Sequence, residues 1–86
     1  MDFFGPDDPV FVISVVSRRF GISAQMLRIF EREGLIEPAR TENQTRLYSE
    51  NNLRRLERIC ELTQVYGVNL AGVKVLLQQE EKKRTR

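Results

Sequence analysis

The hydrophobic residues in the first half of the chain recur every three or four positions in two short segments separated by a glycine. The positions expected to face the interior of a folded domain are Val15, Val16, Phe20, Leu27 and Phe30. Ser14 can cap the first segment as a helix, which Gly21 would end, and Ser23 can cap a second helix over residues 24–33. A short helix, a tight turn and a second helix form the outline of a helix-turn-helix, although many helical pairs that bind no DNA share it.

The pattern changes from helical to extended after Gly34. Pro38 prevents a continued helix, and residues 41–43 are of turn-forming types. Strand-favouring residues follow at Thr45, Leu47 and Tyr48. Residues 37–49 therefore predict a small β-hairpin, which beside a helix-turn-helix is a wing; the alternative is a plain connecting loop with solvated arginines. Another β-branched and aromatic run, residues 10–13, leads the chain into the first helix.

Helical spacing returns in the second half of the chain. Ser49 can cap a helix over residues 50–66, and after Gly67 Asn69 can cap another that starts at Leu70. The expected core positions of these two helices are Leu53, Leu56, Ile59, Cys60, Leu62, Thr63, Tyr66, Leu70, Val73, Leu76 and Leu77. The other faces of the third helix alternate arginine with glutamate, which predicts a solvated, ion-paired surface.

Together these elements predict one mainly α-helical domain over residues 10–79. Its architecture is a winged helix-turn-helix with a small β-hairpin wing and two further helices. Residues 1–9 contain a glycine and two prolines and are expected to form a flexible arm. Residues 80–86 are polar and charged, so we expect a charged tail whose last residues fray.

The composition excludes several classes of protein. No apolar run approaches the roughly 18 residues that a membrane helix needs, and the acidic N-terminus lacks the apolar stretch of a signal peptide. Cys60 is the one cysteine, so an internal disulfide is excluded, and without histidine the usual zinc ligand sets are out of reach. We expect an intracellular, cytoplasmic protein without metal or cofactor. No nucleophile–base pairing and no phosphate loop are visible, so no enzymatic activity is predicted.

The net charge of +2 is unevenly distributed along the chain. Three acidic residues lie in the first eight positions, and from residue 9 onward fourteen basic residues stand against nine acidic ones. On the second predicted helix, Gln25, Arg28 and Arg32 share a stripe away from the core positions. Arginine and glutamine are multidentate donors suited to guanine and adenine edges, and arginine also binds phosphate. The alternative is a solvated helix face in which Arg28 pairs with Glu31, or Arg32 pairs with the neighbours of Glu33.

Several segments together resemble the MerR family of transcription regulators. Residues 13–49 resemble the family's helix, glycine turn, "TLRYYER-G-L--P-R" recognition stretch and the "R-Y" that ends its wing. Residues 53–77 resemble the family's next helix, its glycine-containing second wing and the helix that follows. The resemblance covers about residues 10–77. Within the family, the segments VFVISV, LRIFER and GVNLAGVK look most like the heat-shock repressor (HspR-like) branch.

The resemblance implies sequence-specific binding to an inverted-repeat operator in double-stranded DNA, repression of chaperone operons, and the chaperone DnaK as co-repressor. Arg28 matches the arginine of the recognition stretch and is expected to contact DNA. Arg46 matches the wing arginine, expected to grip phosphate, and Arg40 the arginine after the proline. Tyr48 would either bond phosphate or pack under the wing, and Asn69 lies in the second wing, where a helix start can meet phosphate. The candidate DNA-contacting residues are Ser14, Ser23, Gln25, Arg28, Arg32, Arg40, Arg46, Tyr48 and Asn69.

The chain departs from the family pattern at several positions. Ile29 replaces a common tyrosine and Met26 a typical threonine, which removes polar contacts at both places. Asn43 and Gln44 replace wing-tip glycines, but asparagine tolerates left-handed backbone angles, so we expect the turn to survive. No apolar heptad follows Leu77, and the metal-sensing cysteines of some members are missing. The chain is then a shortened form, a dimer through a short apolar surface, or a monomer that binds DNA beside another copy.

Two other functions stay open at this point. A phage-type excisionase, an architectural protein that bends DNA for recombination, often has a related winged fold. A protein-interaction module that has lost DNA binding belongs to a different class, and the retained Arg28, Arg40 and Arg46 argue against it.

Overall fold

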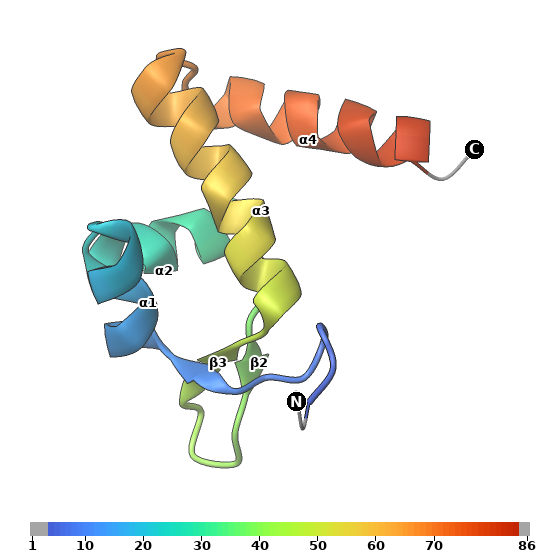
Figure 1. Cartoon of the computed structure of the whole chain (residues 1–86). Helices are drawn as coiled ribbons and strands as arrows, with labels where there is room; N and C mark the ends of the chain where they lie inside the picture. The colour runs from blue at the N-terminus through green and yellow to red at the C-terminus, as the bar shows by residue number, and fades with distance from the viewer. Residues whose placement is uncertain (1–3, 85–86) are drawn as a thin grey trace.

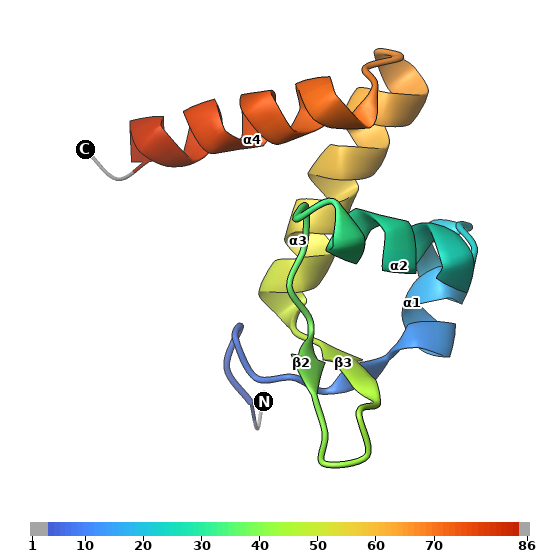
Figure 2. The same cartoon turned by 180° about the vertical axis from the view of Figure 1, so that it is seen from behind.

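The computed structural model describes residues 4–84. Its elements in chain order are β1 (Phe11–Val12), α1 (Ile13–Phe20), α2 (Ala24–Arg32), β2 (Ala39–Arg40), β3 (Arg46–Tyr48), α3 (Glu50–Cys60), the π-helical turn η1 (Glu61–Val65) and α4 (Leu70–Arg84). Figure 1 shows the wing hairpin and α4 at opposite ends of the molecule, with α1, α2 and α3 between them, and the reverse view in Figure 2 agrees. This is the predicted, mainly helical winged helix-turn-helix arrangement.

Helices α1 and α2 form the predicted helix-turn-helix. Gly21 ends α1 in the left-handed conformation, with φ at 66°. Ser23 then caps α2, because its hydroxyl accepts the backbone N–H of Met26 at 3.0 Å. Both predicted boundaries of the turn are therefore confirmed, and they hold the two helices at the spacing of the motif.

The predicted cap at Ser14 is wrong. Helix α1 begins at Ile13, two residues earlier than a cap at Ser14 implies, and Val12 occupies the N-cap position with no side-chain hydrogen bond. The reason is tertiary: Val12 is paired with Leu47 of β3 in the sheet, and the helix starts directly where that pairing ends. Ser14 instead lies exposed in the first turn of α1.

The wing belongs to a three-stranded antiparallel sheet in the order β1-β3-β2. The predicted hairpin is confirmed in β2 and β3, where Arg40 lies opposite Arg46. On the other side of β3, Phe11 lies opposite Tyr48, so the run at residues 10–13 adds a strand before it turns into α1. This third strand fixes the hairpin against the helix-turn-helix.

The wing tip turns at a residue other than the one expected. The hydroxyl of Thr41 accepts the N–H of Thr45 at 3.1 Å, and the carbonyl of Thr41 accepts the N–H of Gln44 at 2.9 Å. Gln44, rather than Asn43, takes the left-handed conformation, with φ at 64°. The turn survives without glycine, at the cost of a side chain in a conformation that L-residues disfavour.

Helix α3 starts as predicted and ends differently. Ser49 and Asn52 form a capping box, each side chain accepting the other's backbone N–H. The expected continuous helix to residue 66 instead widens into the π-helical turn η1, in which Tyr66 donates its N–H to the carbonyl of Glu61. The wider turn shifts the residues after it around the helix axis. Tyr66, predicted in the core, is consequently 65% exposed.

The core is built from side chains of α1, α2, α3, η1 and α4, together with β3 and the segment that follows α2. Its buried hydrophobic members are Val16, Leu27, Phe30, Leu35, Ile36, Tyr48, Leu53, Leu56, Ile59, Leu62, Val73 and Leu77. Most predicted core positions are confirmed as buried or half-buried, and the half-buried ones are Phe20, Cys60, Thr63, Leu70 and Leu76. The prediction for Val15 is wrong, since this side chain is 47% exposed. The predicted cap of α4 is also confirmed, since Asn69 accepts the N–H of Gly72 at 2.8 Å.

Both ends of the described chain contact the domain. In the segment expected as a flexible arm, the carbonyl of Pro6 and the carboxylate of Asp7 accept hydrogen bonds from Asn51, and Phe4 lies edge-on to Phe11. In the segment expected as a charged tail, α4 continues beyond residue 79 as far as Arg84. Residues 1–3 of the arm and 85–86 of the tail lie outside the described residues. The division at residues 9 and 79 stays a prediction.

Candidate nucleic-acid interface

Helix α2 separates its core residues from its polar stripe. Leu27 and Phe30 are buried, whereas Gln25, Arg28 and Arg32 are exposed. Within the described part of the chain Arg28 forms no hydrogen bond or ion pair, so the alternative in which it pairs with Glu31 is not observed. Arg32 makes one loose contact, 4.0 Å from the carboxylate of Glu33. The stripe is free to approach a ligand.

Glu31 joins α2 to the wing. One carboxylate oxygen, Oε1, accepts Nε of Arg46 at 2.6 Å, and the other, Oε2, accepts Nη2 of Arg40 at 3.1 Å. Arg40 also donates through Nη1 to the carbonyl of Gln44 at the wing tip, at 3.1 Å. The two wing arginines, both expected to contact DNA, are therefore held by one residue of α2, which the sequence pattern did not single out as a site residue.

The ionised form of Glu31 is favoured in this arrangement. Burial raises the pKa of this carboxyl, but the hydrogen bonds and positive charges of Arg46 and Arg40 together outweigh burial and leave the pKa below its ordinary value. The carboxylate side chain is 23% exposed and that of Arg46 is 21% exposed. The bridge is partly shielded from water, which strengthens it relative to a pair on the open surface.

Tyr48 is packed under the wing. It is 0% exposed, and its hydroxyl is a buried side-chain polar atom with no hydrogen-bond partner in the described structure. Burial also raises the pKa of the Tyr48 phenol. Of the two roles expected for Tyr48, the structure shows packing under the wing. A hydrogen bond to phosphate would require the hydroxyl to become accessible.

Three polar candidates lie at helix starts. Ser14 is exposed in the first turn of α1, while the side-chain oxygens of Ser23 and Asn69 accept backbone N–H groups as caps of α2 and α4. A capping oxygen is already engaged, so contacts of Ser23 and Asn69 with a phosphate would come mainly from neighbouring N–H groups. Their DNA contacts stay predictions.

Two apolar side chains at the end of η1 are exposed, directly before residues 67–69, which match the family's second wing. Val65 is 72% exposed and Tyr66 is 65% exposed, directly before Gly67, whose φ is 66°. For Tyr66 this departs from the predicted core position, because the π-helical turn shifts it around the helix axis.

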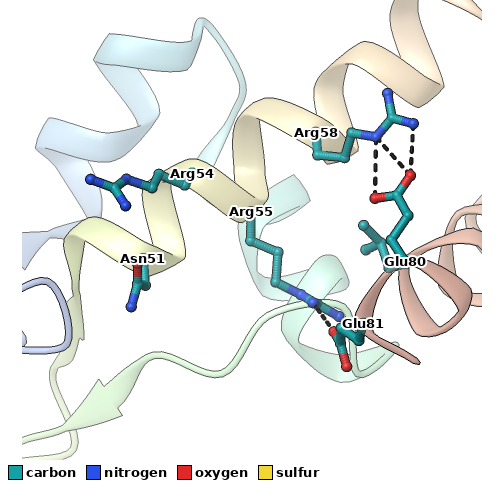
Figure 3. Close-up of a pocket in the computed structure, with 7 residues that line it drawn as sticks. Asn51, Arg54, Arg55, Arg58, Glu80 and Glu81 are labelled. Carbon is teal, nitrogen blue, oxygen red and sulfur yellow. Dashed lines mark hydrogen bonds and ion pairs between the residues drawn. The ribbon is translucent and has the colours of Figure 1, made fainter. Parts of the chain in front are cut away.

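Ion pairs also connect α3 with α4. Arg58 donates from Nη2 and Nε to Oε2 of Glu80 at 2.7 and 3.1 Å. Arg55 donates to Glu81 and to the backbone carbonyl of Leu35, the second residue beyond the C-cap of α2. Figure 3 shows the Arg58–Glu80 and Arg55–Glu81 contacts crossing from α3 to α4. These four residues help to line a hollow of about 340 Å³.

These cross-helix contacts differ from the predicted surface. The expected pairing along this helix is present between Arg54 and Glu50 at 2.9 Å, and between Arg58 and Glu61 at 2.5 Å. Arg55 and Arg58 reach across to a helix more than twenty residues further along the chain, which spacing along one helix cannot indicate. The hydrogen bond from Arg58 lowers the pKa of the Glu80 carboxyl.

The remaining chemistry of the described residues is sparse. Burial raises the pKa of the Cys60 thiol, which makes it a poor nucleophile at neutral pH. Among the residues described, no group of three or more cysteine, aspartate or glutamate side chains is arranged to hold a metal ion. None of the described helices is both long and apolar enough to cross a membrane.

Comparison with known protein families identifies the family of this chain. Residues 11–80 match the family described as MerR HTH family regulatory protein. The chain belongs to the MerR family. The expected resemblance is thereby confirmed over most of the chain, including the recognition helix, both wings and the greater part of α4.

The chain is similar to bacterial proteins over most of its own length. The chain is 40% identical over 74 residues to a Streptomyces coelicolor protein assigned as the heat shock protein HspR, covering 86% of this chain and 49% of that protein. It is 36% identical over 73 residues to the transcriptional regulator GlnR of Bacillus anthracis, covering 85% of this chain and 56% of that one. The chain thus spans about half the length of the curated relatives it matches.

Solved MerR structures share the fold. The lead(II) complex of PbrR691 from Ralstonia metallidurans CH34 superposes with a TM-score of 0.74 at 31% identity, covering 86% of this chain and 57% of that one. HiNmlR, a MerR family regulator lacking the sensor domain and bound to promoter DNA, gives 0.67 at 25% identity, covering 79% and 54%. The chain therefore has both the family membership and the fold of MerR transcription regulators.

Proposed function

We propose that this chain binds a specific operator in double-stranded DNA through α2 and its wings, and that it represses heat-shock or chaperone genes. The observation that carries the DNA-reading part is the exposed stripe of α2, with Gln25, Arg28 and Arg32 directed away from the buried Leu27 and Phe30. In helix-turn-helix proteins the second helix enters the major groove, where such side chains reach base edges.

Repression of chaperone genes is supported by the similarity to HspR, the heat-shock branch. In this proposal Arg40, Arg46, Ser14, Ser23 and Asn69 position the domain on the flanking phosphates, while the reading of bases falls to α2. DnaK is the proposed co-repressor. The relatives are bacterial, and a regulator of bacterial DNA acts in the cytoplasm, which is the proposed location.

Two copies of the chain are proposed to occupy an inverted repeat, either as a dimer or as adjacent monomers. Sedimentation of the chain with duplexes carrying one or two half-sites reports the stoichiometry. A two-to-one complex on the double site supports the proposal. A one-to-one complex on both duplexes contradicts it.

The DNA-reading part is tested with Arg28→Ala. The probes are a duplex selected by the wild-type chain from a random pool and a random-sequence duplex of equal length. Loss of a base contact should weaken binding to the selected duplex by roughly tenfold or more, with a smaller loss on random duplex. Arg54→Ala, a charge-matched control outside the proposed interface, should change both affinities little. Equal losses of Arg28→Ala on both duplexes would reduce Arg28 to a phosphate contact.

A further inference from the structure

Two positive charges face each other in the wing. Arg40 and Arg46 are directly opposite one another in the β2–β3 pair. Like charges at such positions repel and destabilise the pairing. Glu31 compensates for this from outside the sheet, because each of its carboxylate oxygens accepts a hydrogen bond from one of the two guanidinium groups, at 2.6 and 3.1 Å.

The compensation spans two structural units. Glu31 lies on α2, one turn after Arg28, whereas both arginines lie on the hairpin, nine and fifteen residues further along. Arg40 is additionally tied to the carbonyl of Gln44 at the wing tip. A continuous chain of hydrogen bonds therefore runs from the recognition helix through Arg40 to the far end of the wing.

We propose that Glu31 is a positioning residue that couples the wing to the recognition helix and thereby increases the preference for operator over random DNA. The inference rests on the proposed function, because it assumes that α2 reads bases and the wing contacts phosphate. Glu31 itself touches no DNA in this account. It holds the wing arginines at a fixed place relative to Arg28, so that both contacts form together only on a duplex that satisfies α2.

The carboxylate also opposes binding that does not depend on sequence. It carries a negative charge close to the phosphates and occupies N–H donors that would otherwise reach any backbone. On the operator, this cost is offset because a preformed interface loses less conformational entropy on binding. On random DNA there is no such gain, so the carboxylate lowers affinity there. The preference for operator over random DNA is set by the difference between these two effects on binding free energy.

The test compares Glu31→Gln with Glu33→Gln. Both variants remove one negative charge near the end of α2, but Glu33 contacts neither wing arginine and lies only loosely against Arg32. Binding of each full chain is measured on the selected duplex and on random duplex over a range of salt concentrations. Glu31→Gln should bind random duplex more tightly, with a salt slope steeper by up to about 0.9 for each additional phosphate that the released arginines neutralise.

On the selected duplex, Glu31→Gln should lose affinity, so that the ratio of selected to random binding falls roughly fivefold or more, as expected within one salt-bridge network. Glu33→Gln should raise both affinities by a similar factor and keep the ratio. The coupling is overturned if Glu31→Gln keeps the wild-type ratio. If the wild-type chain shows no preference for any duplex, the proposed function fails instead, so the two failures are distinguishable.

Glu31→Asp distinguishes the effect of side-chain length from the effect of charge. It also replaces Glu31→Gln in the test if circular dichroism shows that Glu31→Gln does not fold. Aspartate keeps the negative charge but is one methylene shorter, so it cannot hold both guanidinium groups at the observed distances without moving the backbone. A reduced selected-to-random ratio with an unchanged fold supports the coupling. An unchanged ratio overturns it.

Discussion

At the scale of single residues, the arginines of the interface differ in what already holds them. Arg28 is exposed and forms no ion pair with any described residue, while Arg46 and Arg40 share the carboxylate of Glu31. The sequence predicted a DNA contact for each of these arginines. It could not predict which of them form ion pairs with residues distant in the chain, because residue type and family position do not contain that information. Glu31 is nine and fifteen residues away from Arg40 and Arg46 in the sequence, so only the tertiary structure shows these ion pairs.

Arg46→Ala should destabilise the fold as well as weaken DNA binding. Its guanidinium hydrogen-bonds Glu31 at 2.6 Å in a partly shielded position, so we expect a loss of about 1 kcal/mol in the free energy of unfolding. Arg40→Ala is the comparison, since its side chain is more exposed and should contribute less. Urea unfolding of both variants measures this. An equal loss for the two would contradict the assignment of Arg46 as the stronger partner.

Tyr48→Phe tests the two roles expected for this tyrosine. Its hydroxyl is buried without a hydrogen-bond partner in the described protein, and such a group costs about 1 kcal/mol or more in stability. Phenylalanine should therefore leave stability unchanged or raise the melting temperature, with DNA affinity at the wild-type level. A clear loss of affinity in a stable variant would show that the hydroxyl reaches phosphate in the complex.

At the scale of elements, helix starts that depend on nearby residues were predicted correctly. Ser23, Ser49 and Asn69 each accept a backbone N–H three residues ahead, a contact that local sequence can indicate. Two other features were missed. Helix α1 starts where β1 leaves the sheet, and the helix that continues α3 widens at η1, so both depend on packing rather than on a cap.

The wing tip offers a prediction at this scale. Gln44 has a φ of 64°, a conformation that costs a residue with a side chain roughly 1 kcal/mol and costs glycine little. Gln44→Gly should raise the free energy of unfolding by about 0.5 kcal/mol, after allowance for the greater freedom of glycine in the unfolded chain. Gln44→Ala is the control and should bring no gain. A gain in the alanine variant equal to that of glycine would point away from backbone strain.

At the scale of the whole molecule, α4 is held to the rest of the domain by charge as well as by its apolar side chains. Val73 and Leu77 are buried in the core, and beyond them Glu80 and Glu81 reach arginines of α3 (Figure 3). Arg55 also donates to the carbonyl of Leu35, so the same side chain contacts α4 and the segment that follows α2. The recognition half and α4 are thus connected through α3.

This arrangement predicts loss of stability in acid. The pKa of Glu80 lies below its ordinary value of 4.5 because Arg58 hydrogen-bonds the carboxylate, and the pKa of Glu31 is also lowered. A lowered folded-state pKa means that the contribution is fully present above about pH 4.5 and is lost as the pH falls through the folded value. The melting temperature should accordingly fall between pH 5 and pH 3.

Glu80→Gln isolates the contribution of the α3–α4 contact. At pH 7 the variant should melt a few degrees below the wild type, consistent with a partly exposed pair worth at most about 1 kcal/mol, and the difference should shrink as the pH falls below 4.5. Glu57→Gln removes a charge from a more open contact, 3.8 Å from Arg19, and serves as the control. A difference that persists unchanged at pH 3 would assign the effect of Glu80 to packing instead of charge.

The sequence by itself determined the order of the elements, most of their caps, the core stripes and the family, because each of these depends on residues within a few positions of one another or on a pattern read in order. Only the tertiary structure decided that β1 joins the wing and that Tyr48 is buried. It likewise decided that Tyr66 is exposed and that Glu31 unites the wing with the recognition helix. Those features join residues far apart in the chain, and their energies depend on distance in space, which spacing along the sequence does not contain.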